Sequence, residues 1–87
     1  MTSLYFLEYD LRKSRDYQRL YDALKNVGAV RMLESSWCFR YANTNCVQLR
    51  DFFKQFVDGD DAIVVSQVTD WATWNALGNP NSLKSVA

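Results

Sequence analysis

The chain has 87 residues, of which 48% are hydrophobic and 15% aromatic, so it carries enough apolar material for one hydrophobic core. Ten basic residues balance ten acidic ones, which excludes a domain that coats nucleic acid by bulk positive charge. The sequence contains no histidine, and this excludes histidine metal sites, serine triads and histidine general bases.

Residues 4–11 are predicted to form the first strand, because apolar residues and acids alternate along them. One face of this strand is apolar at its start and acidic at its end: Leu4, Phe6, Glu8 and Asp10. The other face is apolar or aromatic throughout: Tyr5, Leu7, Tyr9 and Leu11. The two acids also make the N-terminal stretch unlike a signal peptide or a membrane span, so we expect a cytoplasmic protein without membrane contact.

A helix is predicted after this strand, capped by Ser14 and closed by Gly28. Its apolar stripe recurs at intervals of three and four residues: Tyr17, Leu20, Tyr21, Leu24 and Val27. Residues 29–35 and 36–42 are predicted to form two strands, although no Asn-Gly or Asp-Gly turn joins them. One bent strand is therefore an alternative interpretation of residues 29–42.

Asn45, with Gln48 three residues later, indicates the start of a second helix, which the acidic run at 58–61 ends. Residues 62–68 form a short apolar run that predicts the last strand. Trp37, Phe39 and Tyr41 alternate along one strand, and such a row indicates a core face more strongly than a base-stacking surface. Cys38 and Cys46 match no zinc or redox spacing, so we expect two reduced thiols.

The predicted order is strand, helix, strand, strand, helix, strand, which is the α+β ferredoxin-like pattern with two helices on one face of a four-stranded antiparallel sheet. The domain is expected to span residues 1–68 and to leave the other sheet face open for a second protomer. Residues 69–87 are expected to form a tail that packs on its own chain or on the dimer partner. Asp70 is a candidate cap for a helical turn through Trp71 and Trp74.

The opening segment LYFLEYDL, the strand pair AVRMLESSWCFRYA and the closing strand DDAIVVSQV together resemble the CRISPR-associated adaptation protein family Cas two and the related VapD ribonucleases. The resemblance covers residues 4–68, and its most specific element is the pair Tyr9-Asp10 at the end of the first strand. It implies a homodimer in which two Asp10 carboxylates face each other and hold Mg²⁺ or Mn²⁺, as the catalytic site of a nuclease acting on RNA or DNA. Glu8 is a candidate second metal ligand.

The same resemblance also implies a second role, a non-catalytic bridge that binds duplex DNA and a CRISPR adaptation protein partner. Basic residues are the candidate nucleic-acid contacts for either role: Arg12, Lys13, Arg15, Arg19, Arg31 and Arg40. The segment LESSWCFR, the zero net charge and the tryptophan-bearing tail depart from the family pattern. These departures favour an alternative function, a non-enzymatic protein-interaction module or a mimic of the family encoded by a mobile element. The simplest interpretation of Asp10 is structural, as a strand end, a loop cap or an ion-pair partner of Arg12.

Overall fold

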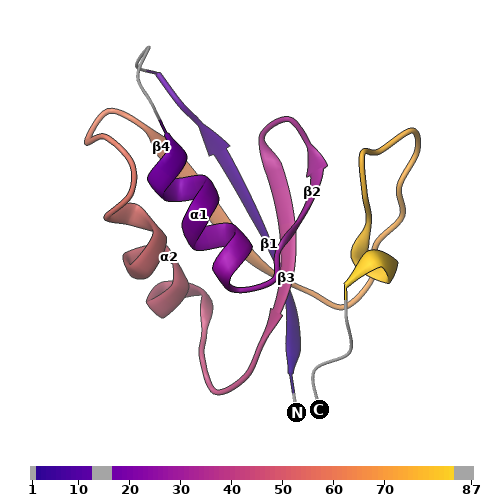
Figure 1. The fold of residues 1–87 in the computed structure, drawn as a ribbon. Helices are drawn as coiled ribbons and strands as arrows, with labels where there is room; N and C mark the ends of the chain where they lie inside the picture. Colours follow the sequence, from indigo (N-terminus) through magenta and orange to yellow (C-terminus); the bar gives the residue numbers. More distant parts are fainter. Residues whose placement is uncertain (1, 13–16, 84–87) are drawn as a thin grey trace.

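The computed structural model describes residues 2–12 and 17–83, which form one antiparallel sheet and two helices (Figure 1). The elements follow the predicted order: β1 (Ser3–Asp10), α1 (Gln18–Asn26), β2 (Val30–Leu33), β3 (Ser36–Tyr41), α2 (Cys46–Lys54), β4 (Ala62–Val68) and a 3₁₀ turn, η1 (Pro80–Ser82). The strands are arranged in the order β2-β3-β1-β4. This arrangement confirms the predicted α+β, ferredoxin-like fold. No helix in the described part of the chain is long and apolar enough to cross a membrane.

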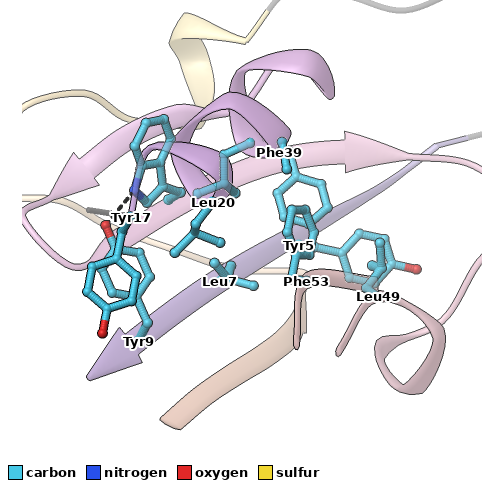
Figure 2. Close-up of a cluster of buried hydrophobic side chains, with 11 residues drawn as sticks. Tyr5, Leu7, Tyr9, Tyr17, Leu20, Phe39, Leu49 and Phe53 are labelled. Atoms are coloured by element: carbon cyan, nitrogen blue, oxygen red, sulfur yellow. Dashed lines mark hydrogen bonds between the residues drawn. The ribbon is translucent and has the colours of Figure 1, made fainter. Parts of the chain in front are cut away.

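The main core lies between the sheet and the two helices, and Figure 2 shows its centre. The predicted alternation along β1 is confirmed, because Tyr5, Leu7 and Tyr9 are buried against the helices. Phe39 of β3 is fully buried and stacks on Tyr5, with ring centroids 5.9 Å apart. Phe53 of α2 packs on Phe39 with ring centroids 5.6 Å apart, so three elements meet at one aromatic cluster. Tyr41, at the end of the predicted aromatic row, is 45% exposed.

Local sequence signals set most of the element boundaries. Gly28 has a φ of +76°, the left-handed conformation that closes a helix, and the side chain of Asn45 caps α2 by accepting a bond from the Gln48 amide at 2.9 Å. The helix α2 ends at Lys54, earlier than the predicted stop at 58–61, because the amides of Phe56 and Val57 bond back three residues in a tightened last turn. The predicted cap Ser14 lies outside the described residues.

The strands β2 and β3 form an antiparallel hairpin, so the alternative of one bent strand is wrong. The turn at Glu34 and Ser35 is held by side chains rather than by an Asn-Gly or Asp-Gly pair. Arg31 Nε and the Tyr9 hydroxyl both donate to the carbonyl of Glu34, each at 3.1 Å. Long-range contacts therefore replace the missing turn residues at this hairpin.

A second, smaller cluster lies on the face that the helices leave uncovered. Leu4, Met32 and Cys38 are buried there, and residues 69–83 run along β2 to cover them (Figure 1). The Leu77 amide bonds the Met32 carbonyl at 2.8 Å, and Trp71 packs half-buried on the cluster. The prediction of a helical turn through Trp71 and Trp74 is wrong, since residues 70–74 form no helix. Packing of Trp71 on the sheet holds this segment in an irregular conformation instead.

The buried thiol of Cys38 gives a test of this second cluster. Burial raises the pKa of the Cys38 thiol from 9.0 to about 11, so the folded state holds the proton more tightly than the unfolded state. The contribution of Cys38 to the free energy of unfolding should therefore be fully present below about pH 9 and fall by about 2–3 kcal/mol as the pH rises to about 11. Urea denaturation at a series of pH values measures this fall. The Cys38→Ala variant should lose less stability over the same range, and parallel profiles for the two proteins would contradict the assignment.

Candidate functional site

The end of β1 carries the predicted catalytic residue, Asp10, which projects into solvent with its side chain 70% exposed. Arg12 Nε approaches the Asp10 carboxylate at 3.3 Å, and Arg12 Nη1 donates to the carbonyl of Asp60 at 3.2 Å. The Arg12 amide also donates to the carboxylate of Asp61 at 2.7 Å. These contacts join the exit of β1 to the loop before β4. Arg12 therefore already has a structural role, and Asp10 takes part in it.

The second predicted metal ligand, Glu8, lies on the same face of β1 as Asp10 but borders a different hollow. Asp10 lines an open hollow of about 490 Å³ with Tyr21 and Arg31, whereas Glu8 lines a groove with Phe6. Within the described residues no group of three or more acidic or cysteine side chains is placed to hold a metal ion. Magnesium requires several oxygen ligands in octahedral array, so the described residues of one chain do not fit it. The Mg²⁺ or Mn²⁺ site stays a prediction that depends on a second copy of Asp10.

The hollow beside Asp10 is organised by Arg31. Its guanidinium lies over the rings of Tyr21 at 5.3 Å and Trp37 at 5.4 Å, and it donates to the Glu34 carbonyl. Trp37 Nε1 donates to the Tyr9 hydroxyl at 3.0 Å, the bond drawn as a dashed line in Figure 2. Desolvation raises the pKa of Tyr9, which keeps its hydroxyl protonated. This network holds the β2–β3 turn. It engages Arg31, which was predicted to contact phosphate, in contacts within the chain.

The other predicted cations do not form one patch with Arg31. Arg40 pairs with Leu4 on the open face of the sheet, whereas Arg31 pairs with Trp37 on the helix face, so the two arginines point to opposite sides. Arg19 of α1 is exposed and lies over the Phe56 ring at 5.5 Å. Arg12 and Arg19 both lie against the segment between α2 and β4. The predicted contacts Lys13 and Arg15 lie outside the described residues.

The structure also forms a groove of about 250 Å³ that sequence reasoning missed. The groove lies between the open sheet face and the tail, and is lined by Phe6, Glu8, Met32, Leu33, Ser36, Ala72, Thr73, Trp74 and Ala76. Large apolar side chains at and near this groove are exposed to solvent: Trp74 at 87%, Leu77 at 71% and Leu33 at 55%. An exposed apolar surface of this kind is typical of a binding site.

The outer edge of β4 is a second surface without a partner in the described part of the chain. β4 pairs only with β1, and the segment Ala62–Val68 contains no charge, no proline and no register shift. Val64 is 58% exposed, and no residue of β4 is fully buried. Exposed edge strands usually contain a charge, a proline or a bulge, each of which hinders pairing with another chain. The strand β4 contains none of these features. The opposite edge, β2, differs because the tail covers it through the Leu77 amide.

No family model and no solved structure matches this chain. The resemblance to the Cas two family therefore stays a prediction.

Proposed function

We propose that the protein is a non-enzymatic interaction module that binds a protein partner through its open sheet face. The groove beside Trp74 carries this proposal, because it combines exposed aromatic and aliphatic side chains with one acid, Glu8. The zero net charge and the structural use of Arg12 and Arg31 support a protein partner over a nucleic acid, since phosphate binding needs uncompensated cations. A protein of the CRISPR adaptation machinery is one candidate for this protein partner.

The uncharged edge of β4 supports a homodimer as the working form of this module. A second copy pairing its own β4 against this edge would extend the sheet and bury apolar side chains such as Val64. An 87-residue chain gains stability from such burial, because a small domain covers a limited share of its surface by itself. In this arrangement three strand spacings separate the two Asp10 residues, which is at least roughly 14 Å. Two carboxylates at that separation would share no metal ion.

Affinity purification of the tagged protein from its own cells tests the proposed module. We expect a protein to be retained by the wild type and lost from Trp74→Ala, because this substitution removes the most exposed aromatic surface at the groove. Phe52→Ala is the matched control, since Phe52 is 44% exposed but lies on α2. Fluorescence anisotropy with labelled RNA and duplex DNA at low salt should show no binding. Tight, salt-sensitive binding of either nucleic acid would contradict the proposal.

The exposure of Asp10 at the end of β1 favours a second candidate, a homodimeric nuclease of the Cas two type. This function requires the open faces of two copies to meet, so that two Asp10 residues, with Glu8 as a further oxygen donor, hold a divalent ion. A metal ion bound there would supply Lewis-acid polarisation of a phosphodiester and a more acidic bound water. Arg12 would have to release Asp10 in such a dimer and would then be free for phosphate.

The nuclease candidate predicts Mn²⁺- or Mg²⁺-dependent cleavage of RNA or duplex DNA that Asp10→Asn reduces at least 100-fold. Asp51→Asn is the matched control, because Asp51 also pairs with a neighbouring arginine, Arg50, at 3.0 Å but lies on α2. Gel analysis of labelled substrates with and without EDTA measures the rates. Cleavage that survives in Asp10→Asn, or that Asp51→Asn abolishes equally, would remove Asp10 from the reaction.

A further inference from the structure

The groove beside the tail has walls and a floor of different chemistry. Phe6 and Leu33 supply apolar surface from the sheet, and Trp74 supplies an aromatic wall from the tail. Glu8 and Ser36 lie next to each other in the floor, because they are paired residues of β1 and β3. With a volume of about 250 Å³ the groove is smaller than a pocket for a drug-sized molecule. It suits a single side chain of a partner.

Among the described residues Glu8 is the one acid that lines this groove, and none of them gives it a hydrogen bond or an ion pair. Its cross-strand neighbours, Ser36 and Val64, are both uncharged. Arg40, on the same sheet face, pairs with Leu4, four residues away along β1. A ligand that covered Glu8 with purely apolar atoms would take a carboxylate out of water without giving it a partner, which is unfavourable. The groove therefore selects a ligand that brings a positive charge.

Trp74, which lines the groove from the tail, favours the same kind of ligand. Its side chain is 87% exposed, and an indole face attracts a cation more strongly than any other aromatic ring does. Phe6 and Leu33 provide apolar surface for an aliphatic stem behind that cation. A phosphate or a carboxylate would be repelled by Glu8. Lysine and arginine have the required combination of an aliphatic stem and a cationic end.

We propose that this groove receives a lysine or arginine side chain of the partner protein, with the cation between Glu8 and Trp74. The inference rests on the proposed function and adds the chemistry that the partner presents. Binding leaves Asp10 and Arg12 in place, because they lie outside the groove lining. The partner surface at this contact is basic.

Titration with a short peptide tests the inference without the natural partner. The probe is an acetylated, amidated pentapeptide with one arginine between alanines, and its control carries norleucine, which keeps an aliphatic stem without charge. We expect millimolar binding of the arginine peptide that shifts the Trp74 indole N–H signal in heteronuclear NMR spectra. The norleucine peptide and the Glu8→Gln variant should each bind at least tenfold more weakly. The Glu34→Gln variant lacks an exposed acid outside the groove, so it should bind the arginine peptide as tightly as the wild type does.

Three results would overturn the inference. Equal binding of the norleucine peptide would show an apolar groove without charge selection, and an unmoved Trp74 signal would place any binding elsewhere. Conversion of a dimer to a monomer by Glu8→Gln, measured by sedimentation, would show that a second copy occupies the groove. Thermal unfolding of each variant confirms that it is folded. Failure here is distinct from failure of the proposed function. A partner that is lost from Trp74→Ala, together with an arginine peptide that does not bind, would contradict only the basic side chain in the groove. A partner that Trp74→Ala retains would contradict the proposed function.

Discussion

Replacing Phe39 by alanine is expected to lower the free energy of unfolding by about 3–5 kcal/mol. Phe39 is fully buried, and its ring contacts Tyr5 of β1 at 5.9 Å and Phe53 of α2 at 5.6 Å (Figure 2). Its removal leaves a cavity at the point where the sheet and α2 meet, and the surrounding rings relax only partly into it. Because small domains have total stabilities of about 5–15 kcal/mol, this loss is a large part of the whole.

Phe52→Ala is the matched control for this substitution. Phe52 contacts the rings of Phe53 and Phe56 but is 44% exposed, so its removal opens no enclosed cavity. We expect a loss of about 1 kcal/mol or less in the control, measured for both variants by urea denaturation followed by circular dichroism. A similar loss in the two variants would contradict the placement of Phe39 at the centre of the core.

Replacing Gly78 by alanine is expected to loosen the tail from the sheet and to lower the free energy of unfolding by about 1–3 kcal/mol. A Cβ atom at Gly78 would lie 2.6 Å from Val30 Cγ1 and 2.8 Å from the Arg31 carbonyl oxygen. Neither atom can move away easily, since one belongs to a β-branched side chain and the other to the backbone of β2. The hydrogen bond from the Leu77 amide to the Met32 carbonyl should lengthen or break.

Hydrogen exchange measures this effect directly, because the Leu77 amide should lose its protection in Gly78→Ala. Gly59→Ala is the matched control, since no atom of the described residues beyond its two chain neighbours lies within 4 Å of a Cβ at that position. The control should be neutral or stabilised by up to about 1 kcal/mol. Unchanged protection of Leu77 in Gly78→Ala would show that the tail does not depend on this close approach.

Loosening of the tail also connects the fold to the proposed function. Trp74 belongs to the same segment as Gly78, and one wall of the groove exists only while this segment lies along β2. Gly78→Ala should therefore weaken the binding of the arginine peptide and also loosen the second apolar cluster. Gly59→Ala should change neither property. A binding loss confined to Gly78→Ala would support the tail as a functional part of the module.

The candidate site was partly predictable from the sequence. Alternation along β1 placed Glu8 and Asp10 on the same face, and the structure shows that this face is the one without helices. The position of Arg12 two residues after Asp10 indicated an ion pair with Asp10, which the structure contains. The separation of Glu8 and Asp10 into two hollows was not predictable. It depends on where the tail and the β2–β3 turn lie, and neither follows from the periodicity of β1.

The sequence by itself determined the order of elements, the two faces of β1 and the ends of the helices at Gly28 and Asn45. These features are local, since side-chain period and capping chemistry act over a few neighbouring residues. Only the tertiary structure decided that Arg31 is held between Tyr9, Tyr21 and Trp37, and that the tail forms a groove with Trp74 as its wall. Those features join residues far apart in the chain, and packing energies rather than local propensities select them.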